Sequence, residues 1–364
     1  MTRPPILYVN EVTYPIMAAF GISGSHPCKR PKGYTCLFSS LTFILVPKEF
    51  FQVMQHSILE CCANILTAAI LYQEKCGLSR GITRYMMAMA ISALLVIFWH
   101  VLLREIYIYY HPNSLLSLST VCPFNIYLRI VTLDYSVWLT VSFTFDRFVS
   151  ICYPRLSLRC CTHRTAIVVI VSLCALSCLK YLPFYFMYEP RYILYSVNWG
   201  CQPKAAYFTS DWWVIFSWMC TISVSFLPFV LILVLNGLTV KNIVAANRVR
   251  RHLKGLEVKD IEGENRRKSI VLLFTVSGTY ILLWTTETAA FICTRITVNF
   301  VGGDLTSPSY IANEVGVLLM LLNSCVNTCI YALTQRKFRE EVKITLKHVA
   351  QFICKCQKIS SQWA

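Results

Sequence analysis

The sequence predicts an all-α membrane protein, a seven-transmembrane helix bundle followed by a short amphipathic eighth helix. Of its 364 residues, 56% are apolar and only 14% are charged, a balance that repeated membrane spans produce and that soluble domains rarely show. A transmembrane helix needs about 20 mainly apolar residues to cross the bilayer. Seven windows of this kind lie near 51–73, 83–108, 122–152, 165–187, 211–240, 268–294 and 309–333.

The first window is the least regular, because its outer half carries several polar side chains. These are Gln52, Gln55, His56 and Glu60. An acidic residue at the centre of a membrane span costs about 2.5–3.5 kcal/mol on insertion scales. The outer half of this helix is therefore the least regular part of the predicted bundle.

Basic residues are concentrated in two connections, after the fifth span and after the seventh. The formal net charge of +16 could suggest a nucleic-acid partner, but no single amphipathic face collects these charges. Positively charged loops remain on the cytosolic side of a membrane. We therefore expect a multi-pass protein of the plasma membrane with an extracellular N-terminus, and no nucleic-acid partner.

The segment after the seventh span predicts an interfacial helix. Phe338, Val342 and Leu346 recur at helical spacing among basic residues, a pattern typical of helices that lie on the membrane surface and contact its lipids. Cys354 and Cys356 follow and are candidates for palmitoylation. They are about as often unmodified.

A charged motif closes the third span at its cytosolic end. Asp146, Arg147 and Phe148 stand there, 25 residues after Cys122. At 1.5 Å per residue that separation is about 37 Å, which places the cysteine and the arginine at opposite faces of the membrane. Trp284, Asn327 and Tyr331 stand at depths consistent with these two residues, and the first and fifth spans contain Asn64 and Pro228.

Over about residues 63–347 these motifs resemble the rhodopsin-like (class A) G-protein-coupled receptors. The resemblance implies a receptor that passes an extracellular small-molecule or peptide signal to a heterotrimeric G protein, and a disulfide between Cys122 and Cys201. It also implies a set of residues for G-protein coupling and activation: Asp146, Arg147, Phe148, Asn327, Tyr331, Trp284, Pro228 and Asn64.

Within this family the chain is most similar to the probable G-protein-coupled receptor 139 group, which is linked to aromatic amino acids. In those relatives helix one is unbroken, whereas here its two halves look separated, so about 23–62 is interpreted as an insertion. We expect an extracellular N-terminal segment at 1–50, a receptor domain at 51–334, and a cytosolic amphipathic helix and tail at 335–364.

The sequence departs from the family pattern at several positions. Ala93 replaces the aspartate of a sodium site, Thr328 replaces the proline of the seventh helix, and no proline follows two residues after Trp284. Arg266 stands where many relatives carry the acid that pairs with Arg147. A receptor that couples weakly is therefore an alternative.

Charged residues in the upper bundle predict the ligand site. Arg129 lies 18 residues before Arg147, about 27 Å higher on the third helix, and charges at such depth indicate function. We hypothesise that Arg129 receives a carboxylate, Glu287 an amine and Trp284 an aromatic group, with Asp134 deeper. An Arg129–Glu287 bridge that only neutralises both charges is nearly as plausible.

Other function classes fit the sequence less well. A light receptor would need a lysine in the seventh span for a retinal Schiff base, and 309–334 contains none. A transporter or channel remains the alternative from another class, although no internal repeat indicates inverted halves. No pattern of an enzyme, a metal site or a cofactor site stands out, so none is expected.

Overall fold

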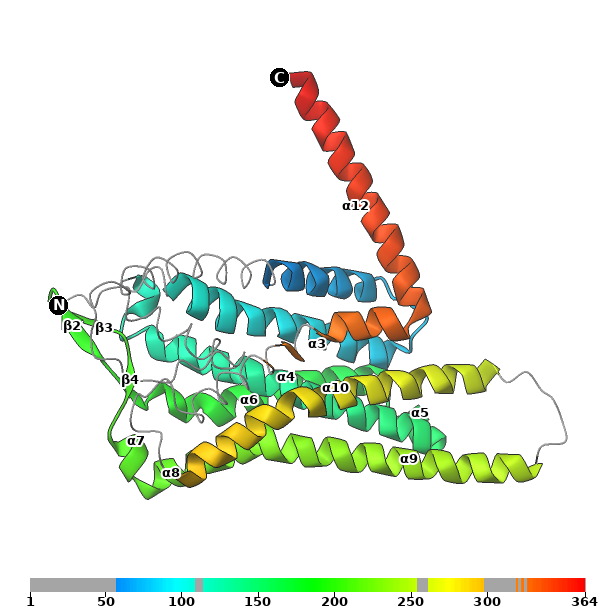
Figure 1. Cartoon of the computed structure of the whole chain (residues 1–364), viewed down its shortest axis with the longest axis horizontal. Helices are drawn as coiled ribbons and strands as arrows, with labels where there is room; N and C mark the ends of the chain where they lie inside the picture. The colour runs from blue at the N-terminus through cyan, green and yellow to red at the C-terminus, as the bar shows by residue number, and fades with distance from the viewer. Residues whose placement is uncertain are drawn as a thin grey trace, which may run out of the picture. The chain divides into compact units, whose positions relative to one another are not determined.

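In the residues that it describes, the computed structural model of the chain is mainly helical (Figure 1). Residues 61–281 and those from 326 onward belong to one compact unit, which contains most of the features below. The described residues 57–60, 282–297, 319 and 322–323 belong to a second unit. The residues that the structure describes are 57–108, 114–253, 261–297, 319, 322–323 and 326–363.

Helices occur where the sequence predicts the first six spans. The first span is described as the helix Ser57–Tyr72; the remainder of the proposed insertion, 23–56, lies outside the described residues. The others are α3 (Arg80–Val96) with η1 (Ile97–Ile108), α4 (Cys122–Cys152), α6 (His163–Tyr185), α8 (Asp211–Thr221) with η3 (Ile222–Phe226) and α9 (Leu227–Leu253), and α10 (Ile261–Thr297).

Among the described residues, three helical stretches are long and apolar enough to cross a membrane: Arg80–Leu103, His163–Tyr185 and Asp211–Ala245. Shorter apolar stretches occur at Ser57–Tyr72 and Ile270–Thr285. Most of the predicted seventh span lies outside the described residues, but 326–334 are helical. The apolar residues Val168, Val171, Leu176 and Leu179 of α6 are more than 60% exposed, as expected of a helix side that faces lipid.

Local sequence signals set the helix ends. The Ser79 hydroxyl accepts a hydrogen bond from the Ile82 N–H at the start of α3, and Thr162 caps α6 in the same way. Each cap satisfies a backbone donor that has no partner within its own helix. Pro154 follows the last turn of α4 and disfavours helical geometry at the residue before it, so α4 ends at Cys152 and α5 (Pro154–Cys160) begins.

The third span, α4, is the centre of the larger unit. It contacts α3, α6 and α9 and is 31 residues long. The largest buried cluster among the described residues joins side chains from several helices near the end of α4 that carries Arg147. Its members include Leu71, Tyr85, Met86, Leu139, Phe143, Leu272, Val276, Ile330, Tyr331 and Phe338.

The connection between the fourth and fifth spans folds into two short antiparallel ribbons. β1 (Tyr188–Glu189) pairs with β4 (Gln202–Pro203), and β2 (Tyr192–Leu194) pairs with β3 (Val197–Trp199). The hairpin residues Tyr195 and Ser196 have φ values of 51° and 62°. A two-residue turn with both φ values positive matches the twist of paired strands.

The amphipathic helix, α12 (Arg336–Trp363), is 28 residues long and continues well beyond the predicted segment. Cys354 and Cys356 lie within it, although their side chains are outside the described part of the structure. Phe338 is fully buried and makes an edge contact with the Tyr331 ring, with centroids 6.2 Å apart. This contact anchors the first turn of α12 beneath the end of the seventh span.

Candidate functional site

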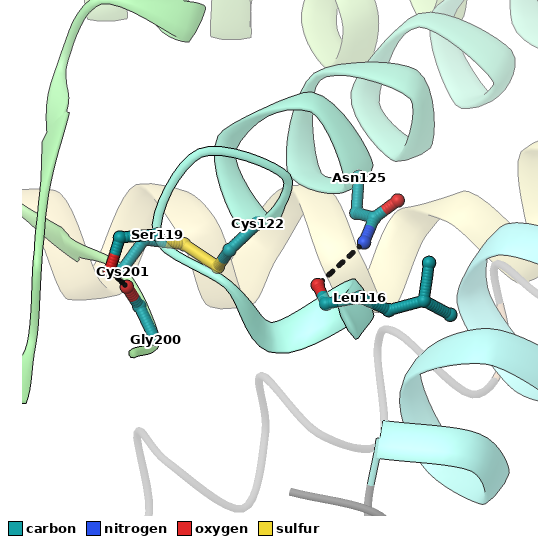
Figure 2. Close-up of a disulfide and its surroundings, with 6 residues drawn as sticks. All are labelled: Leu116, Ser119, Cys122, Asn125, Gly200 and Cys201. Carbon is teal, nitrogen blue, oxygen red and sulfur yellow. Dashed lines mark hydrogen bonds between the residues drawn. A yellow bond between two sulfur atoms is a disulfide. The ribbon is translucent and has the colours of Figure 1, made fainter. Parts of the chain in front are cut away.

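A disulfide joins the start of α4 to the connection between the fourth and fifth spans. Cys122 and Cys201 are bonded, with their Cα atoms 6.0 Å apart (Figure 2). The pairing was predicted from the family resemblance and is confirmed. It fixes the loop to the end of the third span that lies opposite Arg147.

Hydrogen bonds reinforce the same junction. The Ser119 hydroxyl donates to the Gly200 carbonyl at 2.7 Å (Figure 2). The Gly200 N–H donates to the Ser117 carbonyl at 2.7 Å. Gly200 has φ +66°, where a side chain is strained, and an added Cβ would lie 3.2 Å from the Cβ of Arg191. The Asn125 amide donates to the Leu116 carbonyl at 3.0 Å. Hydrogen bonds to the loop backbone therefore hold the loop in place together with the Cys122–Cys201 disulfide.

Arg129, the proposed carboxylate receptor, lies half-buried on α4. Its backbone carbonyl accepts from the Thr132 hydroxyl at 3.0 Å and lies 3.1 Å from His100 Nε2. Its guanidinium acts on Tyr188 of the outer loop: burial raises the pKa of Tyr188 to about 12, and the positive charge of Arg129 opposes part of that rise. The upper part of α4 thus faces the loop that the disulfide holds.

Two of the other three proposed ligand residues, Trp284 and Glu287, lie on α10 in the second unit. Trp284 is 2% exposed, and its carbonyl accepts from the Thr288 hydroxyl at 2.8 Å. Glu287 lies on the same helix, one turn further on, and its side chain is outside the described part. The ligand pocket remains a prediction.

Asp134 lies within a buried polar cluster between three helices. Its carboxylate accepts hydrogen bonds from Ser177 at 2.7 Å, Lys180 at 2.5 Å and Tyr181 at 3.3 Å. Sequence reasoning missed Lys180. Its signal is nevertheless present, because it is a lysine inside an otherwise apolar span.

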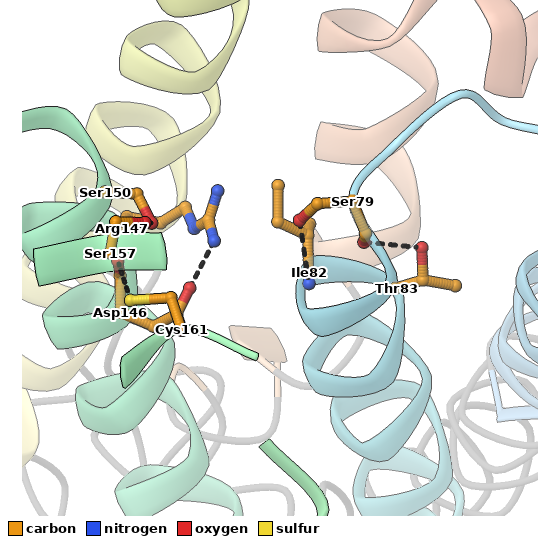
Figure 3. A network of polar contacts seen from close by, with 8 residues as sticks. All are labelled: Ser79, Ile82, Thr83, Asp146, Arg147, Ser150, Ser157 and Cys161. Atoms are coloured by element: carbon orange, nitrogen blue, oxygen red, sulfur yellow. Dashed lines mark hydrogen bonds and ion pairs between the residues drawn. The ribbon is translucent and has the colours of Figure 1, made fainter. Parts of the chain in front are cut away.

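Near the C-terminal end of α4, Arg147 is paired with its neighbour Asp146. The guanidinium donates to the Asp146 carboxylate (Figure 3), and the side chains are only 5% and 8% exposed. The guanidinium carbon also lies 5.9 Å from the centre of the Phe143 ring. Within the described part of the chain, Arg147 Nε has no hydrogen-bond partner. The arginine is a buried cation with unused donor capacity.

Neighbouring side chains hold this motif in place. The Cys161 thiol contacts the Asp146 backbone carbonyl at 3.7 Å (Figure 3). Phe148 is buried, and its ring meets that of Tyr153 edge-on with centroids 5.7 Å apart. The three predicted motif residues are therefore buried at the junction of α4 with the following loop.

Thr328, which stands where the family carries a proline, links the seventh span to the first. Its hydroxyl lies 3.4 Å from Asn64 Oδ1 and accepts from the Thr67 hydroxyl at 3.0 Å. Asn64 and Thr67 are both fully buried. A proline at this position would have no group to make these contacts, so the departure from the pattern creates a helix–helix connection of its own.

Tyr331 and Asn327 complete the inner end of the seventh span. The Tyr331 hydroxyl lies 3.7 Å from the Met89 sulfur on α3, and both residues are buried. Asn327 is 6% exposed. Arg339 of α12 donates to the carbonyls of Ala332 and Leu333 at 3.1 and 2.8 Å, which satisfies the end of the preceding helix.

Two further positions noted in the sequence are Ala93, which departs from the family pattern, and Pro228, which agrees with it. Ala93 is fully buried on α3, and its neighbour Ser92 contacts Ser136 of α4 through hydroxyls 3.4 Å apart. A hydroxyl pair therefore lies beside Ala93, where relatives carry an aspartate. Pro228 is buried near the start of α9, directly after η3. Because proline has no N–H to donate, a local change of hydrogen-bond register before it is expected.

Comparison with known families gives a match over most of the chain. The family described as "7 transmembrane receptor (rhodopsin family)" matches residues 63–331. The match begins one residue before Asn64 and ends at Tyr331, so it includes the disulfide cysteines, the motif at the end of α4 and the inner end of the seventh span.

Proposed function

Because the chain belongs to the rhodopsin family of seven-transmembrane receptors, we propose that it carries an extracellular signal to a cytosolic heterotrimeric G protein at the plasma membrane. The observation that supports coupling is the buried Asp146–Arg147 pair at the end of α4. In this proposal the N-terminus and the Cys122–Cys201 disulfide face the outside.

The chemistry of Arg147 suits it to a two-state role. A guanidinium has five N–H donors, and here one carboxylate and one aromatic face occupy it while Nε has no partner in the described chain. In the active state backbone carbonyls of a G-protein helix would accept from the arginine once the sixth span moves outward. Binding of the partner would then select the conformation in which the guanidinium is accessible.

The proposed ligand is amino-acid-like. Arg129 supplies a positive charge near the outer loop, and Glu287 and Trp284 would supply an acid and an aromatic surface. A free amino acid with an aromatic side chain carries the three complementary groups. The simpler alternative is an Arg129–Glu287 ion pair without a ligand role.

The test is a G-protein nucleotide-exchange assay on the receptor in lipid nanodiscs, screened with free amino acids and short peptides. We expect at least one such compound to raise exchange. Arg129→Ala should raise the half-maximal concentration at least tenfold, because a charge-assisted hydrogen bond is lost. Arg191→Ala, at an exposed loop position, is the matched control. An unchanged response of Arg129→Ala would remove the pocket from the proposal.

A receptor that couples weakly is the second candidate. Ala93 and Thr328 both replace residues that the family uses in activation, and the Thr328 contacts tie the seventh span to the first. This candidate predicts ligand binding with little nucleotide exchange. Membership of a receptor family favours both candidates over a transporter or channel, which would instead show substrate flux in sealed vesicles.

A further inference from the structure

We propose that Asp134 and Lys180 form an internal latch that ties the third, fourth and fifth spans together and fixes the register of the fifth. Asp134 lies on α4, Lys180 on α6, and Ser223, the third member, on η3. The proposal concerns the helix bundle itself and does not depend on G-protein coupling.

The geometry is that of a fully connected ion pair. Lys180 Nζ lies 2.5 Å from Asp134 Oδ1 and 3.0 Å from the Ser223 hydroxyl. The second carboxylate oxygen accepts from Ser177 at 2.7 Å. The ammonium also lies 4.6 Å from the centre of the Tyr181 ring, within the range of a cation–π contact.

Burial makes this pair sensitive to the loss of either member. The Asp134 side chain is 2% exposed and the Lys180 side chain 25% exposed. A carboxylate away from water is tolerated only where a cation and hydrogen-bond donors compensate it. Lys180 supplies the ammonium that compensates the Asp134 carboxylate, and the Ser177 and Tyr181 hydroxyls supply further hydrogen-bond donors.

The third member of the latch lies in a distinctive backbone segment. η3 spans Ile222–Phe226, with π-helical hydrogen bonding, between the α-helical segments α8 and α9. A π-helical turn rotates the following residues relative to an uninterrupted α-helix, and such turns are frequent at functional sites. The Lys180–Ser223 bond joins this turn to the Asp134 ion pair. Loss of the ammonium therefore frees the turn to change its register.

The first experiment measures thermal unfolding of the purified full-length receptor in nanodiscs. Lys180→Met keeps the length of the side chain and removes the charge, and Asp134→Asn removes the opposite charge. Each should lower the midpoint by about 5 °C or more, because one buried charge loses its partner. The double variant, Lys180→Met with Asp134→Asn, should recover at least half of the decrease in midpoint that the single variants show. Lys204→Met, which removes an exposed loop lysine bonded to the Phe186 carbonyl, is the control.

The pattern across these variants decides the proposal. Single variants that unfold within about 1 °C of the control, or a double variant whose loss equals the sum of the single losses, would overturn it. If neither single variant yields folded protein, the double variant decides: a folded double variant supports the ion pair, and an unfolded one contradicts it.

A second measurement tests the connection to the fifth span, which a general loss of stability would not reproduce. Amide hydrogen exchange should accelerate at least tenfold in Ile222–Phe226 in both Lys180→Met and Ser223→Ala. Exchange at the inner end of α4 should stay unchanged in Ser223→Ala. Unchanged exchange in η3 of both variants would refute the latch, as would an acceleration that is uniform along the chain.

Discussion

Thr328→Val is the substitution that isolates the connection between the first and seventh spans. Valine has nearly the shape of threonine, so packing is largely retained while the hydroxyl is lost. Two contacts disappear: the 3.4 Å contact with Asn64 Oδ1 and the 3.0 Å hydrogen bond from Thr67. The change leaves the backbone hydrogen bonds of the helix in place.

The expected cost follows from these contacts. Side-chain hydrogen bonds between membrane helices contribute about 0.6 kcal/mol on average and at most about 1.7. Thr67 has an alternative acceptor in the Ala63 carbonyl at 2.8 Å, so its hydroxyl need not lose a partner, whereas the fully buried Asn64 loses a donor. We expect a total loss of about 1 kcal/mol, which lowers the unfolding midpoint by about 2 °C in a protein of this size.

The assay is thermal unfolding of the receptor in nanodiscs, with Thr334→Val as the matched control. Thr334 lies on the same helix, and within the described residues its hydroxyl bonds only to the Ile330 carbonyl, one turn before it. Thr328→Val should lower the unfolding midpoint more than Thr334→Val does. Adding Thr67→Val to Thr328→Val should lower the midpoint little further. Equal losses at 328 and 334, or fully additive losses at 67 and 328, would refute the connection.

Two further predictions concern the cysteines. Cys122→Ser and Cys201→Ser should each lower the free energy of unfolding by about 4.5 kcal/mol, the value expected for a bond that closes a loop of 79 residues. The double variant should lose no more stability than either single variant, and additive losses in the unfolding midpoint would contradict this prediction. Burial raises the pKa of the Cys161 thiol above its usual 9.0, so its thiolate fraction at pH 7–8 is low. Alkylation of Cys161 should therefore be slower than that of the exposed Cys160, and the difference in rate should narrow as the pH rises. Equal alkylation rates at pH 7.5, measured by mass spectrometry of labelled peptides, would contradict this prediction.

Much of the fold could be predicted because helices in a membrane are specified locally. Apolar windows of span length carry the signal, and α3, α4 and α6 lie where these windows place them. Helix ends were less predictable. α12 extends to Trp363 because the sequence after 347 still supports a helix, whereas we based the predicted end on the apolar spacing alone.

The pairing of side chains across helices could not be read from the sequence. Asp134 was singled out as a charge in the third span, but its partner Lys180 lies 46 positions away on another helix. Rotation of each helix about its axis decides which residues meet, and hydropathy does not specify it. Thr328 was noted only as a missing proline, although its hydroxyl makes the contact with Asn64. The disulfide was predictable because the family resemblance supplied the pairing.

The most direct test of the central claim is basal nucleotide exchange by heterotrimeric G proteins on matched amounts of folded receptor in nanodiscs. Asp146→Asn removes the carboxylate that holds Arg147, so it should raise basal exchange severalfold. Arg147→Ala should abolish exchange while leaving the Cys122–Cys201 disulfide intact. Exchange by Arg147→Ala equal to that of the unaltered receptor would contradict the account.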